Sequence, residues 1–266
     1  VSGKIWRQQK VNKNLVEKVK QDHVLGDILS RLIISRNYDT SEIYSINNSQ
    51  KLTNILKDDY DCHKASLVLL DSIKNNENIC ILGDYDVDGT CATSLLVRYF
   101  KHIDQKYFFY IPDRVKDGYG ASKKLFQKLI LKNPKLIIMV DCGSTSNDAI
   151  EYLNQHNVRS IIIDHHEINK PYPKSDAIIN PKKEFFNKEN SLLCATALTY
   201  FFLDNLIKKS KSNFKINNFL IYVLLATVCD VMPLRKINKI IARNTINDFN
   251  LKNNVAINYI FDQFNL

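Results

Sequence analysis

The sequence of 266 residues contains no pair of cysteines at Cys-x-x-Cys spacing. Its cysteines are scattered along the chain, at Cys62, Cys80, Cys91, Cys142, Cys194 and Cys229. Such scattering argues against a zinc ribbon or a disulfide framework and is typical of reduced thiols in the cytosol. Cys142 and Cys229 each lie beside a candidate metal ligand, and we interpret both as small packing residues.

Apolar runs such as 136–140 and 161–163 are too short to cross a bilayer, and the chain does not open on a signal-peptide pattern. The sequence also has no internal repeat and no low-complexity block. We therefore expect a soluble, cytoplasmic protein with no membrane partner. Its length allows one large domain or two small ones, and an apolar content of 45% is ordinary for a globular protein.

The charge is unbalanced toward basic residues, with a formal net charge of +9 and a pI near 9.1. A basic surface attracts polyanions, of which nucleic acid is the most common. Lysine is plentiful throughout the chain, so a general lysine-rich composition is the alternative explanation. Charge by itself therefore only slightly favours nucleic-acid binding.

Apolar segments with the length of buried strands alternate with segments of helical periodicity. This alternation predicts an α/β fold, a parallel sheet flanked by helices on both faces. We expect a helical N-terminal region over 1–75 that packs on the core, followed by an α/β catalytic domain over 76–266. The strands are expected at 79–82, 107–111, 136–140, 158–163 and 177–179, and helices of the α/β part at 91–103, 122–131, 147–157, 192–207 and 219–229.

Three aspartates at every second position, Asp84, Asp86 and Asp88, directly follow the first predicted strand. Carboxylates this close repel one another unless a cation or protons compensate their charge. A solvated acidic turn is one alternative. An EF-hand loop is another, but its twelfth position requires a bidentate Glu and is Leu95 here. The pattern therefore favours a divalent-metal site of another kind.

Two more predicted strands end in ionisable groups, the third in Asp141 and the fourth in Asp164-His165-His166. The carboxyl ends of parallel strands share one edge of the sheet, so these groups are expected to converge there. Carboxylates with one or two imidazoles suit Mn²⁺ or Mg²⁺, and there are enough of them for two ions. Two divalent cations at one site predict metal-assisted hydrolysis of a phosphoester.

These motifs resemble those of the DHH phosphoesterases and, within them, the RecJ single-strand-specific exonucleases. The signature Asp-His-His is residues 164–166, and the other shared motifs are residues 83–89 (GDYDVDG), 140–143 (VDCG) and 226–234 (ATVCDVMPL). Stretches similar to RecJ in particular are 111–114 (IPDR), 117–120 (DGYG), 178–181 (IINP) and 193–195 (LCA). The resemblance runs in order from about Gly3 to Ala256.

The resemblance implies a role for each matching residue. The metal ligands it implies are Asp84, Asp86, Asp88, Asp141, His165 and Asp230. Asp141 is the implied bridge between two ions. Asp84 is either a further metal ligand or a residue that supports the ligands without contacting the metal. Asp230 rests on the resemblance alone, since without it a helix-end capping charge would be the favoured explanation of its position.

The resemblance also implies roles around the metal ligands. Asp164 orients a neighbouring histidine. His166 contacts the scissile phosphate or supports the ligands. Arg114, Gly118 and Gly120 hold a substrate phosphate or form a structural turn.

The activity implied is a metal-dependent 5′→3′ exonuclease that releases mononucleotides from single-stranded DNA during repair and recombination. RecJ proteins continue into a second core domain and an OB-fold, so we expect this chain to be truncated on its C-terminal side only, since 1–6 resembles the start of longer relatives. A separately encoded C-terminal half is then a candidate partner. Thr196-Ala197 also stands where such proteins often have a glycine.

The sequence alone leaves two other functions open. The chain is either a truncated or split fragment with little activity alone, or a DHH phosphoesterase with a small substrate such as a dinucleotide or nanoRNA. The shared metal motifs permit the small substrate, whereas the DGYG and INP stretches and the helical N-terminal region argue against it.

Overall fold

The structure is a computed structural model that describes residues 3, 5, 7, 9–48, 50–118, 120–184, 191–250 and 254–264. The chain forms two compact units, Val1–Lys51 and Leu52–Leu266. Trp6 and Tyr119, which belong to stretches that resemble RecJ, lie outside the described residues.

The unit boundary at 51/52 differs from the boundary predicted at 75/76. Helix α4 (Tyr60–Lys74) belongs to the second unit, where it packs against β5 (Ala177–Ile179) and α8 (Ala195–Ser210). The cause is its apolar face, since Ala65 and Leu69 are fully buried in the core of the sheet. Packing of the N-terminal region on the core stays a prediction.

The first unit consists of α1 (Lys13–His23), α2 (Asp27–Ser35) and α3 (Thr40–Asn47). Its small core is built around Val19, Ile33 and Ile43. Asp39 begins α3 with a capping box, in which its side chain accepts from the N–H of Glu42 and the Glu42 side chain accepts from the N–H of Asp39.

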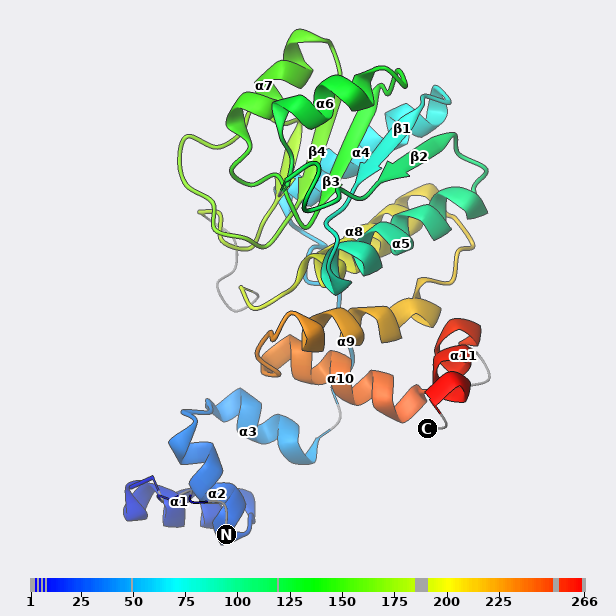
Figure 1. Cartoon of the computed structure of the whole chain (residues 1–266). Helices are drawn as coiled ribbons and strands as arrows, with labels where there is room; N and C mark the ends of the chain where they lie inside the picture. The colour runs from blue at the N-terminus through cyan, green and yellow to red at the C-terminus, as the bar shows by residue number, and fades with distance from the viewer. Residues whose placement is uncertain are drawn as a thin grey trace. The chain divides into compact units, whose positions relative to one another are not determined.

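The second unit contains a five-stranded sheet in which every described pairing is parallel (Figure 1). Its strands are β1 (Ile79–Leu82), β2 (Tyr107–Tyr110), β3 (Leu136–Val140), β4 (Arg159–Ile163) and β5, in the order β2-β1-β3-β4-β5. This confirms the predicted fold class. The strand order reverses between β1 and β3, which is where open parallel sheets bind ligands.

Helices cover both faces of the sheet. Successive side chains of each strand point to opposite faces, and apolar side chains on both faces need to be buried. Ile138 and Val140 of β3 face the core shared with α4, α5 (Val87–His102) and α8. Met139 faces the opposite core, which contains α6 (Lys123–Ile130) and α7 (Asn147–Gln155) (Figure 1). Ser122 caps α6 through the N–H of Leu125, at the position predicted from the sequence.

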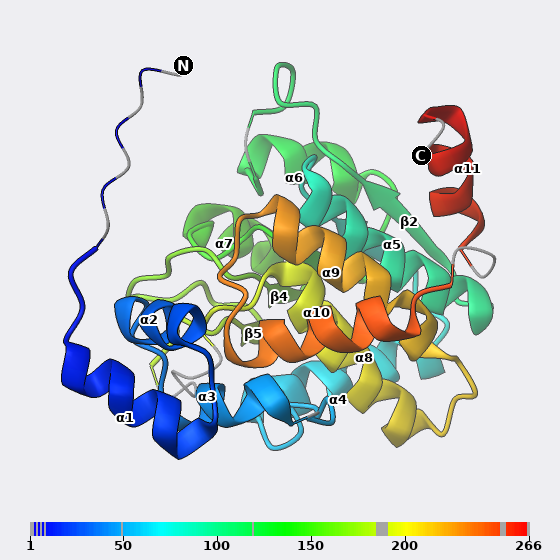
Figure 2. The ribbon, with the colours of Figure 1, turned by 90° about the horizontal axis from the view of Figure 1, so that it is seen from below.

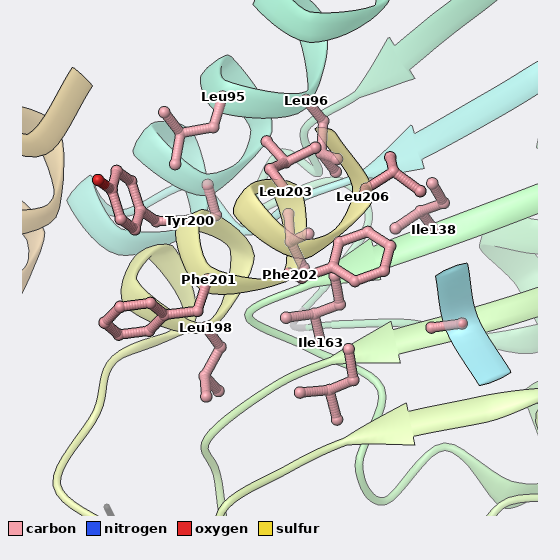
Figure 3. Packing of buried hydrophobic residues seen from close by; sticks show 14 of the residues in the cluster. Leu95, Leu96, Ile138, Ile163, Leu198, Tyr200, Phe201, Phe202, Leu203 and Leu206 are labelled. Atoms are coloured by element: carbon pink, nitrogen blue, oxygen red, sulfur yellow. The ribbon is translucent and has the colours of Figure 1, made fainter. Parts of the chain in front are cut away.

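Helix α8 is the centre of the larger core, with twelve of its sixteen residues buried. Figure 3 shows Phe202, Leu203 and Leu206 of α8 packed among Leu95 and Leu96 of α5 and residues of the sheet. Burial of a large apolar side chain stabilises the fold by roughly 1.5–3 kcal/mol each. The position of α8 relative to α5 is therefore strongly fixed.

The chain then forms a 3-10 turn η2 (Ile216–Phe219), α9 (Leu220–Cys229), α10 (Lys236–Asp248) and α11 (Val255–Phe264). Helices α9 and α10 lie side by side, and α9 packs on α5 and α8 (Figure 2). Within the described ranges, no helix combines the length and the apolar character that a membrane span needs.

Candidate metal centre

The sheet register aligns the acidic residues that follow β1, β3 and β4. Val140 pairs with Ile163, so Asp141 and Asp164 are the next residues on neighbouring strands. The N–H of Asp141 still donates to the carbonyl of Ile163 at 2.9 Å. Leu82 pairs with Met139, which places Asp84 at the same edge. The convergence predicted from the sequence is therefore present in the structure.

The turn from β1 into α5 brings Asp86 and Asp88 to this edge. Asp86 is the N-cap of α5 and accepts from the N–H of Gly89 at 2.9 Å. Helix α5 thus begins at Val87, four residues before the predicted helix, because Asp86 caps it. Gly89 lies directly against Asp84, and a Cβ atom there would be 2.5 Å from the Asp84 nitrogen.

Replacing Gly89 with alanine should therefore displace the first turn of α5. We expect a loss of stability of about 1–3 kcal/mol, because the backbone of Asp84 cannot yield as a flexible side chain does. Thermal melting with and without Mn²⁺ measures the effect. Gly26→Ala is the matched control, since no atom lies within 4 Å of its Cβ position. Equal melting temperatures for the two variants would contradict this close approach.

Asp141 lies at the centre of the acidic groups with only 1% of its surface exposed. Its backbone is left-handed, with φ of 63°. Among the described residues, neither carboxylate oxygen has a hydrogen-bond partner. Burial raises the pKa of Asp141 to about 10, and the charges of Asp88 and Asp86 act in the same direction. A cation between these groups would relieve both penalties.

His165 is surrounded by carboxylates on three sides. Its Nε2 lies 3.3 Å from Asp141 Oδ1, 3.5 Å from Asp230 Oδ2 and 3.7 Å from Asp88 Oδ2. These approaches are not aligned as hydrogen bonds, since within the described chain both His165 Nε2 and Asp230 Oδ2 lack a partner. Asp230 reaches the centre from the C-cap of α9, and burial raises its pKa.

The possible ligand atoms form three overlapping groups, each with all atoms within 4.8 Å of one another. The groups are Asp84/Asp86/Asp141, Asp88/His165/Asp230 and Asp141/His165/His166. Asp141 belongs to two of them, and so does His165. All six implied ligands are therefore brought together in space, whereas a role of Asp141 as a bridge between two ions stays a prediction.

Asp164 faces away from this cluster and holds the two histidines in place. Its Oδ1 accepts from the N–H groups of His165 and His166 and from His166 Nδ1 at 2.8 Å, while Oδ2 accepts from Ser144 N–H. Burial opposes its charge, but the bond from His166 and the other donors outweigh it and lower the pKa of Asp164 to about 2. An ionised acceptor requires that His166 Nδ1 carries a proton.

Arg114 stacks on the ring of Tyr85, with its guanidinium carbon 5.5 Å from the ring centroid. Tyr85 lies between Asp84 and Asp86 in the sequence. Its loop is fixed by Asp117, which accepts from Tyr110 Oη at 2.6 Å and Lys128 Nζ at 2.8 Å. The bonds from Lys128 and Tyr110 hold the pKa of Asp117 down, at about 2. Arg114 is thus placed beside the cluster, whereas substrate binding by it stays a prediction.

Gly118 and Gly120 adopt φ angles of 80° and 71°, which favour glycine over other residues. This supports the structural-turn alternative for both. Gly118 is exposed, whereas Gly120 lines a pocket of about 810 Å³ that also contains Asp164 and His166. A role of these glycines in substrate binding stays a prediction.

The two cysteines beside candidate ligands differ in their surroundings. Cys142 is buried and lies 4.0 Å from the carbonyl of Leu82, as expected of a packing residue. The prediction was wrong for Cys229, which is exposed because α9 turns Leu225, Val228 and Cys229 toward solvent. All six cysteines are free thiols.

Three contacts of the centre could not be recognised in the sequence. Ala195 and Thr196 donate their backbone N–H groups to Asp88, and Ser144 donates its own to Asp164. Backbone donors carry no residue-type signal. The sequence had pointed to this part of the chain only through the RecJ-like stretch 193–195 and the Thr196-Ala197 pair that follows it.

Comparison with known proteins identifies the family and several relatives of this chain. Residues 78–227 match the family model described as "DHH family, N-terminal domain". The chain is 26% identical over 245 residues to the single-stranded-DNA-specific exonuclease RecJ of Bacillus subtilis, a match covering 89% of this chain and 30% of that protein. It is 29% identical over 189 residues to RecJ of Escherichia coli K12, covering 67% of this chain and 33% of that protein.

A solved structure of RecJ from Thermus thermophilus in complex with Mn²⁺ superposes with a TM-score of 0.69 at 19% identity. The match covers 86% of this chain and 32% of that one, and it shows that the fold is shared. The chain spans about a third of the length of the curated relatives it matches.

Proposed function

The chain belongs to the DHH family, and from this membership and the geometry of its acidic centre we propose that it hydrolyses phosphodiester bonds with divalent cations. The observation that carries the proposal is a set of buried, unpaired polar atoms. Among the described residues, both oxygens of Asp141, Nε2 of His165 and Oδ2 of Asp230 lack hydrogen-bond partners. Buried polar atoms are normally paired, so such a set is expected where a ligand supplies the partner.

The donor set fits Mn²⁺ or Mg²⁺. Asp84, Asp86 and Asp141 would hold one ion, while Asp88, Asp230 and His165 would hold the other with Asp141 as the bridge. Carboxylate oxygens with a single imidazole are typical of hard or borderline cations. Ions bound there supply an activated water and neutralise the charge that develops on a phosphate.

The residues around the ligands would position the substrate. The hydrogen bond between His166 Nδ1 and Asp164 holds the imidazole ring in place beside the acidic cluster, where it would contact a phosphate oxygen. Arg114, held over the ring of Tyr85, offers a cation next to the turn that carries Asp84 and Asp86. We assign both residues to phosphate binding, with Gly118 and Gly120 allowing the loop its turn.

We assign single-stranded DNA as the substrate, with degradation in the 5′→3′ direction. The named relatives are single-stranded-DNA-specific exonucleases, and the net charge of +9 favours binding of a polyanion. The same relatives favour this substrate over a dinucleotide or nanoRNA. By the same resemblance, we place the activity in DNA repair and recombination in the cytoplasm, and a separately supplied C-terminal half as its partner.

Incubation with a labelled single-stranded oligonucleotide tests the proposal. Mononucleotides should be released when Mn²⁺ or Mg²⁺ is present, faster from a single strand than from a blunt duplex, and not in EDTA. If the chain alone is slow, the C-terminal part of a RecJ relative, which contains the second core domain, is added as a separate protein to complete the substrate cleft. No release under either condition would contradict the proposal, and a preference for dinucleotides would favour the small-substrate alternative.

A further inference from the structure

The first turn of α8 binds the carboxylate of Asp88 directly. The N–H of Ala195 donates to Asp88 Oδ2 at 2.7 Å, and the N–H of Thr196 donates to Oδ1 at 2.8 Å. Cys194, the N-cap of α8, makes no side-chain capping bond of its own. Asp88 therefore caps α8 from another helix and satisfies two of its free N–H groups.

A third bond joins the same residues through the main chain. The hydroxyl of Thr196 donates to the backbone carbonyl of Asp88 at 2.8 Å, and Thr196 is fully buried. Asp88 is thus held at its carboxylate and at its backbone by one neighbouring residue. Rotation of its side chain and displacement of its helical turn are both opposed.

These hydrogen bonds determine which carboxylate oxygen of Asp88 is turned toward the proposed cation. A carboxylate oxygen has two lone pairs, and each oxygen of Asp88 uses one of them for an N–H group of α8. Oδ2 lies beside the cluster, 3.7 Å from His165 Nε2 and in the group that includes Asp230. Helix α8 can serve as a fixed support because its Leu203 and Leu206 belong to the same buried cluster as Leu96 of α5 and Ile138 of β3 (Figure 3).

We infer that Thr196 is a positioning residue of the metal centre, which together with the N–H of Ala195 sets the orientation of Asp88 toward the cation. The inference rests on the proposed function and deepens it. It also gives a reason for a hydroxyl-bearing residue at the start of α8. A side chain without a hydroxyl would leave the Asp88 carbonyl without this donor.

Equilibrium Mn²⁺ binding to the full chain without DNA, measured by electron paramagnetic resonance, tests this inference. Thr196→Val keeps the shape and removes the hydroxyl, and we expect it to weaken Mn²⁺ binding about tenfold, as is typical of groups that orient a ligand. Thr196→Ser should restore binding to within about threefold of the wild type, because it restores the donor.

Thr199→Val is the matched control on the same helix. Thr199 is equally buried, but its hydroxyl has no partner in the described part of the chain, so its removal should leave Mn²⁺ binding unchanged. Ala195→Pro is a second probe that does not depend on Thr196. Proline suits the first helical position and lacks the N–H that reaches Asp88, so it too should weaken binding.

Unchanged Mn²⁺ binding in folded Thr196→Val, with only a lower melting temperature in EDTA, would mean a purely structural role and would overturn the inference. Equal losses in Thr196→Val and Thr199→Val would overturn it as well. If these variants bind Mn²⁺ normally while the wild type hydrolyses DNA, the inference fails and the proposed function stands. If the wild type binds no Mn²⁺, the proposed function fails and the inference fails with it.

Discussion

Asp141→Asn should reduce metal-dependent hydrolysis by on the order of a thousandfold or more, because it removes the carboxylate that belongs to two of the three groups of possible ligand atoms and is the proposed bridge between the ions. Asparagine has the same shape but offers a single neutral oxygen and cannot bridge two cations. Single-turnover rates on a labelled single strand, at saturating Mn²⁺, measure the effect on the reaction rather than on metal occupancy.

The same substitution should stabilise the metal-free protein, which distinguishes loss of a ligand from loss of the fold. Burial makes a charge at Asp141 costly, and its neighbours are also carboxylates. A neutral amide avoids that cost, and we expect the metal-free variant to gain about 1–3 kcal/mol at alkaline pH. Thermal melting in EDTA measures this gain.

Asp71→Asn is the matched control for this experiment. It removes the same charge, but Asp71 pairs with Arg159 at the start of β4, at the opposite edge of the sheet. Its activity should remain near that of the wild type, since exposed ion pairs contribute less than about 1 kcal/mol. Activity retained in Asp141→Asn, or lost equally in Asp71→Asn, would show that the ligand set is wrong.

The metal-free protein should lose stability as the pH rises, and Mn²⁺ should reverse this trend. The pKa of Asp141 is near 3.8 when unfolded and is raised to about 10 in the fold. Between these values the native state binds a proton that the unfolded state has released. The free energy of unfolding therefore falls with pH, by up to roughly 1.4 kcal/mol per pH unit.

His166 contributes in the same direction over part of this range. Its hydrogen bond to Asp164 raises its pKa above the ordinary 6.5, so its contribution is present below that value and is lost at higher pH. Asp164 acts in the opposite sense, because its pKa is lowered, and its contribution is lost only in acid. In the neutral to alkaline range, Asp141 and His166 therefore both lower the free energy of unfolding as the pH rises.

Melting temperatures in EDTA should be lower at about pH 9 than at about pH 6. With excess Mn²⁺ the order should reverse, because metal binding releases the protons and is favoured at higher pH. Calorimetry in two buffers of different ionisation enthalpy should detect this proton release. A metal-free melting temperature that rises with pH would contradict a raised pKa for Asp141.

Residues whose role depends on local pattern were predicted well from the sequence. Leu136–Val140 and Ala177–Ile179 are strands with the predicted bounds, and Ser122 caps α6 as expected. The convergence of Asp141 with the aspartates after β1 also followed, because parallel strands present their carboxyl ends at one edge. Periodicity and strand direction were enough for these features.

Features that depend on distant chain segments could not be predicted in this way. Asp230 comes from the end of α9, where an aspartate looks like an ordinary helix cap, and only the family resemblance pointed to it. The N–H groups that hold Asp88 belong to α8, about a hundred residues later in the chain. The sequence did not show that α4 belongs to the second compact unit, because the apolar face of a helix does not reveal which surface it covers.

Anomalous scattering from crystals grown with Mn²⁺ is the most direct measurement of the proposed centre. We expect two peaks within coordination distance of Asp141, one shared with Asp84 and Asp86 and the other with His165, Asp88 and Asp230. A Mn²⁺ peak elsewhere in the molecule, with Asp141 left without a ligand contact, would show that these side chains do not form a metal centre.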